Sequence, residues 1–168
     1  MVIREIEMTD APQFVEMIKQ VETESQYMLF EENERKLSSE QQEKQIEMMK
    51  QQRNSTLLVA EVEGELVGYL QAVGGVVNRS AHIAYVSMGI LKDYRGMGIG
   101  LQLFQQLEEW AKEQQIHRLE LTVVVENVIA IHLYKKIGFQ IEGTKKHSLR
   151  INGQYVDEYI MSKLLDVE

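Results

Sequence analysis

The spacing of apolar residues along the chain predicts an alternation of strands and helices. Apolar positions recur at three- and four-residue steps in four segments, as on one face of an amphipathic helix. These segments follow Pro12, span 40–53, follow Gly98 and follow Asn127. Apolar and β-branched runs predict strands at 2–7, 56–63, 66–77, 82–91, 119–125, 139–149 and 155–164. We therefore expect an α/β (α+β) chain with a sheet of about seven strands and about four flanking helices.

Turn and cap signals separate these segments. Glu63-Gly64 and Asn152-Gly153 stand between strand-like runs, where such pairs are typical of β-hairpins. Thr9 or Asp10 and Asn127 are candidate helix N-caps, and Gly138 is a candidate C-cap. The sheet should therefore begin antiparallel, and the two later helices should make crossovers. No linker or repeat interrupts the chain, so we expect one domain over residues 1–168.

A strand, a glycine-rich turn and a helix follow one another between Tyr85 and Lys112. The turn reads Arg95-Gly96-Met97-Gly98-Ile99-Gly100. The first amides of a helix have no intrahelical acceptor, and the helix dipole adds partial positive charge there. Because glycine lets a ligand approach the backbone closely, this unit suits a phosphate-sized anion. Arg95 is placed either to contact that anion or to brace the loop.

Two common phosphate-binding patterns do not fit the loop. A P-loop needs Lys and then Ser or Thr at its end, but Leu101 and Gln102 follow Gly100. A dinucleotide fingerprint needs G-x-G-x-x-G, and the glycines here have a different spacing. The run R-G-M-G-I-G instead resembles the acetyl-CoA pyrophosphate loop Q/R-x-x-G-x-G/A of the GCN5-related N-acetyltransferase (GNAT) family. Residues 127–139 resemble the second family signature, N-x-x-A-x-x-L-Y-x-x-x-G-F.

The resemblance covers residues 57–164 and implies a GNAT fold whose mixed, mostly antiparallel sheet is splayed at the cofactor site. It implies acetyl-CoA as co-substrate and direct acetyl transfer to a primary amine of a small molecule or protein N-terminus. Met88 is the expected backbone donor to the thioester oxygen, near a bulge eased by Gly89. The implied cofactor-binding residues are Met88, Gly89, Ile90, Arg95, Gly96, Met97, Gly98, Ile99, Gly100, Asn127, Ala130, Tyr134 and Lys136.

Three catalytic residues are expected. Tyr134 matches the family's general acid, because a phenol can protonate a departing thiolate. Met88 supplies the backbone donor. The base is less well marked, and Glu31 in the substrate-side segment is the chosen candidate, with Glu32, Glu24 and Tyr85 as alternatives. A packing role for Gly89 and Tyr134, and a solvated surface position for the glutamates, are the competing structural interpretations.

Composition limits the other possibilities. The chain has 168 residues, 44% hydrophobic content, no cysteine and a net charge of −8. It therefore forms no disulfide, thiolate metal site or cysteine nucleophile, and we expect no metal. The acidic balance disfavours nucleic acid and suits cationic amines. No signal segment or membrane span is visible, which favours a cytoplasmic protein.

Three alternatives remain open at this stage. One is transfer of another acyl group, such as succinyl. Another is a non-catalytic acyl-CoA-binding module, and the third is a generic phosphate-binding α/β domain. The resemblance leaves room for a homodimer through the last strand.

Overall fold

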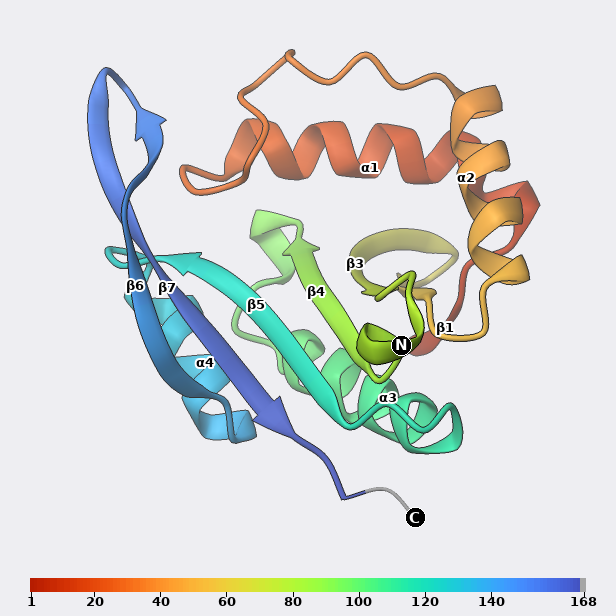
Figure 1. Ribbon diagram of the computed structural model, residues 1–168. Coiled ribbons are helices and arrows are strands. Elements are labelled where there is room, and N and C mark those ends of the chain that lie inside the picture. Colours follow the sequence, from red (N-terminus) through yellow and green to blue (C-terminus); the bar gives the residue numbers. More distant parts are fainter. Residues whose placement is uncertain (167–168) are drawn as a thin grey trace.

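The computed structural model of the protein describes residues 1–166 and contains one seven-stranded sheet in the order β1-β2-β3-β4-β5-β7-β6 (Figure 1). The strands are β1 (Val2–Glu5), β2 (Thr56–Val62), β3 (Glu65–Gly74), β4 (Ile83–Ile90), β5 (Arg118–Val124), β6 (Gln140–Ile151) and β7 (Gln154–Leu164). The α-helices are α1 (Ala11–Glu24), α2 (Ser39–Gln51), α3 (Ile99–Glu113) and α4 (Val128–Ile137). This matches the expected number of strands and helices.

The sheet is mostly antiparallel, and its one parallel pair opens along its length. All described neighbours pair antiparallel except β4 and β5. The parallel register joins Ile83 to Arg118 and ends where Tyr85 faces Glu120. Strand β4 nevertheless continues to Ile90, and β5 continues to Val124. The two strands therefore diverge over their C-terminal halves, which confirms the expected splayed sheet.

Helices cover both faces of the sheet. Helices α1 and α2 lie on one face, and α3 and α4 lie on the other (Figure 1). Each face has its own apolar core. Phe14, Val21 and Ile46 belong to the α1-side cluster, whereas Phe104 and Phe139 belong to the α3-side cluster. Buried apolar side chains on both faces stabilise this three-layer arrangement.

Local sequence signals place most element ends correctly. The turns at Glu63-Gly64 and Asn152-Gly153 have positive φ at both positions, as a tight hairpin turn requires. Gly138 ends α4 in the left-handed conformation. The strand expected at 66–77 ends at Gly74, and the one expected at 2–7 ends at Glu5. These shorter strands are corrections to the expected boundaries.

Asp10 departs from its expected capping role. It occupies the N-cap position of α1, but its side chain makes no cap bond to that helix. Its carboxylate instead accepts two hydrogen bonds from Arg4, at 2.7 and 2.9 Å, and one from the Glu7 backbone N–H. The carboxylate thus ties the end of β1 to the start of α1.

Candidate active site

The glycine-rich loop adopts a conformation that requires glycine at two positions. Gly96 and Gly98 have φ of +75° and +81°, values that side-chain-bearing residues rarely adopt. A Cβ at either position would meet no atom within 4 Å. Backbone conformation, and not packing within the protein, therefore explains these two glycines. The open space in front of them is where the predicted anion would approach.

The start of α3 leaves backbone donors free beside this loop. Gly98 is its N-cap, and the first helical bond runs from Gln102 N to Gly98 O. The amides of Ile99, Gly100 and Leu101 therefore lack an acceptor within the helix. Arg95 Nε donates to Ile90 O at 3.2 Å, so Arg95 braces the loop against the end of β4.

The backbone groups of alternate β4 residues face the opening between β4 and β5. Gly75 N donates to Ile83 O, and Leu91 N donates to Val67 O, so these odd-numbered residues face β3. The backbone N–H and C=O groups of successive residues in a strand point to opposite sides. Those of Met88 and Ile90 therefore point away from β3, toward the side where β5 diverges from β4. The Met88 N–H thus faces the opening between β4 and β5.

Three of the predicted segments pack together at Gly100. A Cβ at Gly100 would lie 2.9 Å from Leu133 Cδ2 and 3.6 Å from both Ile90 Cδ1 and Met88 Cε. The loop, the end of β4 and the middle of α4 therefore meet at this point. Close helix packing, and not anion contact, accounts for glycine here.

Gly89 is likewise a packing glycine. The β3–β4 register passes through Gly89 without a shift, so the expected bulge is absent on that side. A Cβ at Gly89 would lie 2.7 Å from Tyr69 Cε1 and 2.7 Å from Val21 Cγ1. The backbone of Gly89 also faces β3 and not the opening. Of the three β4 residues expected to bind cofactor, only Met88 and Ile90 present their backbone there.

Tyr134 lies in the α3-side core with its hydroxyl free. Its ring packs edge-on against Phe104, with the ring centroids 5.8 Å apart. Burial, and secondarily the neighbouring Tyr85, raises the pKa of Tyr134 to about 12. Within residues 1–166, the Tyr134 hydroxyl makes no hydrogen bond to the protein. The only fully buried side-chain N or O atom without a hydrogen-bond partner in that range is Ser148 Oγ. The phenol is therefore neutral and has a proton to donate.

The second signature shapes the first turn of α4. Asn127 Oδ1 accepts from Ala130 N at 3.3 Å, which confirms the predicted N-cap. Ala130 packs against the α3-side core. Lys136 is exposed in the last turn of α4 and forms no ion pair with any residue from 1 to 166.

Comparison with known protein families agrees with this geometry. The sequence model described as the acetyltransferase (GNAT) family matches residues 18–139. The chain belongs to the GNAT acetyltransferase family. The expected family and the class of enzyme, an N-acetyltransferase, are thereby confirmed.

Two curated relatives match more than half of this GNAT chain. An L-amino acid N-acetyltransferase of Escherichia coli K12 is 38% identical over 64% of this chain and 67% of its own length. A spermidine N(1)-acetyltransferase of the same strain is 33% identical over 58% of this chain and 52% of its own length. The matched segments thus span about half to two thirds of these relatives.

Two solved structures match nearly the whole fold. A GNAT-family acetyltransferase from Streptococcus pneumoniae superposes with a TM-score of 0.94 at 31% identity, covering 98% of this chain and 99% of its own. A protein from Salmonella typhimurium, solved with its cofactor acetyl-CoA, has a TM-score of 0.87 at 20% identity and covers 100% of this chain and 95% of its own. The first supports the GNAT fold directly, and the second shows a shared fold.

Glu31 does not join the other predicted residues of this GNAT site. It is exposed in the loop between α1 and α2, and its backbone N–H donates to Glu34 Oε1. None of its described contacts reaches Tyr134, Met88 or the glycine loop. Glu24, an alternative base, accepts a hydrogen bond from Lys92 N and so anchors α1 to the start of that loop.

Sequence reasoning missed two polar contacts, one of which lies at the opening. Tyr85 Oη lies 2.8 Å from Thr122 Oγ1 and so bridges β4 and β5 just where they separate. Glu22 is 4% exposed and accepts from Arg35 Nε at 2.8 Å. Neither pair follows a local motif, because each joins segments that only the tertiary fold brings together.

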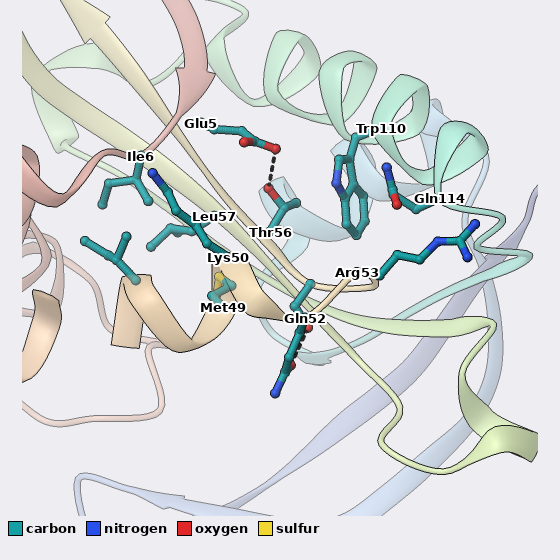
Figure 2. Close-up of a pocket in the computed structure, with 12 residues that line it drawn as sticks. Glu5, Ile6, Met49, Lys50, Gln52, Arg53, Thr56, Leu57, Trp110 and Gln114 are labelled. Carbon is teal, nitrogen blue, oxygen red and sulfur yellow. Dashed lines mark hydrogen bonds between the residues drawn. The ribbon is translucent and has the colours of Figure 1, made fainter. Parts of the chain in front are cut away.

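A separate hollow of about 230 Å³ lies at the start of β2 (Figure 2). Trp110 of α3 forms one wall, and Glu5 accepts a hydrogen bond from Thr56 Oγ1 beside it. None of the predicted site residues lines this hollow. It is therefore distinct from the opening between β4 and β5.

Metal and membrane features are absent from the described part of the chain. Residues 1–166 contain no group of three or more His, Cys, Asp or Glu side chains placed to hold a metal ion. Among the helices of that range, none is both long and apolar enough to cross a membrane.

Proposed function

We propose that this chain transfers the acetyl group of acetyl-CoA directly to a primary amine. The observation that carries the proposal is the opening between β4 and β5. It has unpaired backbone groups of β4 on one side, the glycine loop near one end and the free hydroxyl of Tyr134 close by.

The residues around the opening suit acetyl-CoA. The free amides of Ile99, Gly100 and Leu101, together with the dipole of α3, suit its pyrophosphate. The backbone of Met88 and Ile90 offers a strand edge to its amide-containing arm, although Arg95 already occupies the Ile90 carbonyl. The Salmonella structure with acetyl-CoA, which shares the fold, supports this assignment. When bound, acetyl-CoA supplies an activated thioester.

Two groups of the chain carry the chemistry in this proposal. The Met88 N–H, fixed in β4, polarises the thioester carbonyl by donating to its oxygen. Tyr134 Oη gives its proton to the departing thiolate, the nitrogen releases one proton as the amide forms, and the tyrosinate takes up a proton to restore the phenol. Because burial raises the pKa of Tyr134 to about 12, the phenol holds this proton until transfer.

The attacking amine must reach the site without its extra proton. A free alkylammonium has a pKa of about 10.4, so only about one molecule in a thousand is neutral near pH ~7.4. None of the contacts described for residues 1–166 links Tyr134 or Met88 to a carboxylate or a histidine. We therefore assign no side-chain base, and the rate should rise with pH as more amine becomes neutral.

The relatives define the amines to test first. Their names specify L-amino acids and spermidine as acceptors. The acidic net charge of −8 also favours an amine over an anionic acceptor. A panel of L-amino acids, spermidine and short peptides with a free N-terminus covers these classes.

The test combines binding and turnover. Isothermal titration should give micromolar affinity for acetyl-CoA, and thiol release should then depend on one amine class of the panel. Acetyl-CoA binding without turnover on any amine would favour the non-catalytic module. Faster transfer from succinyl-CoA than from acetyl-CoA would favour the other acyl group.

A further inference from the structure

Tyr69 lies on the α1 face of the sheet, directly across from Gly89. The two residues are register partners in β3 and β4. Tyr69 is 3% exposed, and its ring packs edge-on against Phe14 of α1 with centroids 5.6 Å apart. The ring also extends sideways over β4. Its Cε1 and Cζ atoms lie 2.7 and 3.3 Å from the point that a Gly89 Cβ would occupy.

This position brings the hydroxyl of Tyr69 to the strand that borders the opening. The hydroxyl oxygen is bonded to Cζ, so it lies above β4 and not above β3, the strand to which Tyr69 belongs. Only the missing side chain of Gly89 leaves room for it. Tyr69 belongs to the α1-side cluster and Tyr134 packs against the α3-side cluster, so the two phenols lie on opposite faces of the sheet.

The hydroxyl has no partner within the described protein. Burial is the main cause of the raised pKa of Tyr69, and no hydrogen bond contributes to it. The Tyr69 hydroxyl oxygen is not fully buried, because Ser148 Oγ is the only fully buried side-chain N or O atom without a hydrogen-bond partner in residues 1–166. A nearly buried hydroxyl without a protein partner is costly unless water or a ligand satisfies it. Phenylalanine would pack against Phe14 and Val21 equally well without that cost.

We propose that the Tyr69 hydroxyl binds the acceptor amine at the α1 side of the opening, where it accepts a hydrogen bond from the attacking nitrogen. This inference rests on the proposed function and adds a residue to its acceptor site. The raised pKa keeps the phenol neutral, so Tyr69 orients the amine and does not act as a base. Tyr134 approaches from the other face and protonates the leaving sulfur, so the two phenols have separate roles.

The test is Tyr69→Phe in the full-length protein, with the best amine from the acceptor panel as probe. Loss of one neutral hydrogen bond should lower kcat/KM for the amine by about 3- to 10-fold. Because the hydroxyl has no protein partner, the melting temperature should not fall. The dissociation constant for acetyl-CoA should stay within about twofold of wild type, because Tyr69 is assigned no contact with it.

Tyr159→Phe is the matched control. Tyr159 also lies in a strand and packs partly buried against the α3-side core. It has no assigned contact with acceptor or cofactor, so its kcat/KM should equal that of wild type. This control measures the effect of removing a sheet tyrosine hydroxyl in general.

The outcomes separate the two proposals. An unchanged amine kcat/KM in Tyr69→Phe, with an active wild-type enzyme, would overturn the role of Tyr69 alone. An equal loss in Tyr159→Phe would overturn it as well. Wild-type protein that binds acetyl-CoA but acetylates no amine would overturn the proposed function, and the role of Tyr69 with it.

Discussion

Replacing Gly89 by alanine tests the packing of β4 against the Tyr69 ring, the proposed acceptor contact. The added Cβ would lie 2.7 Å from Tyr69 Cε1 and 2.7 Å from Val21 Cγ1. Carbon atoms pack best at about 3.5–4.0 Å, so each contact must lengthen by about 1 Å. Both neighbours are buried, at 3% and 1% exposure, and cannot simply rotate into solvent.

The magnitude follows from two opposing effects. Overpacking of this kind costs about 1–3 kcal/mol. Removing glycine from the unfolded chain returns about 0.4–1 kcal/mol. We therefore expect a net destabilisation of about 1–2 kcal/mol and a fall in melting temperature of about 2–8 °C. Displacement of the Tyr69 ring should also lower kcat/KM for the amine.

Gly143→Ala is the control for this prediction. Gly143 also lies in a strand, but a Cβ there meets no atom within 4 Å and its φ is not in the left-handed region. This variant should be as stable as wild type or slightly more stable. Thermal unfolding followed by circular dichroism compares the two. Gly89→Ala with an unchanged melting temperature and full activity would refute the packing argument.

Two further predictions concern Tyr134 and Asp10. Tyr134→Phe should lower kcat by about 100-fold or more while acetyl-CoA affinity stays unchanged; an unchanged rate in steady-state assays would remove Tyr134 from the mechanism. Asp10→Asn should cost about 1–3 kcal/mol at neutral pH, because it loses charge-assisted bonds to Arg4. Those bonds hold the pKa of Asp10 below 3.8, so its contribution is present above that pH and is lost as pH falls through the lowered value. Urea unfolding should therefore give a difference between Asp10→Asn and wild type that shrinks below pH 3.8; a constant difference would contradict the assignment.

Features fixed by neighbouring residues could be predicted from the sequence. The Asn152-Gly153 turn, the Asn127 cap and the Gly138 C-cap all depend on local backbone preferences. The alternation of apolar positions likewise located the seven strands and four α-helices that the structure describes within residues 1–166. Such signals are readable because each depends on only a few consecutive residues.

Features fixed by tertiary contacts could not be predicted. The reason for glycine at position 89 lies in Tyr69 and Val21, which come from β3 and α1. No sequence pattern marks Glu22, which the fold buries and pairs with Arg35. Glu31 was chosen as base because of its segment, and the structure leaves it exposed in a loop. The surroundings of each of these residues depend on which distant segments pack together. A short stretch of sequence does not show that packing.

The most direct test of the central claim is a calorimetric titration of the protein with acetyl-CoA, CoA and ATP, repeated for Gly98→Glu. Gly98 stands at the N-cap of α3 with φ of +81°. Glutamate there adds bulk, strain and negative charge where a phosphate should bind. We predict micromolar binding of acetyl-CoA and CoA, weak or absent binding of ATP, and loss of binding in the variant. Equal affinity for all three ligands, or full affinity in Gly98→Glu, would contradict the account.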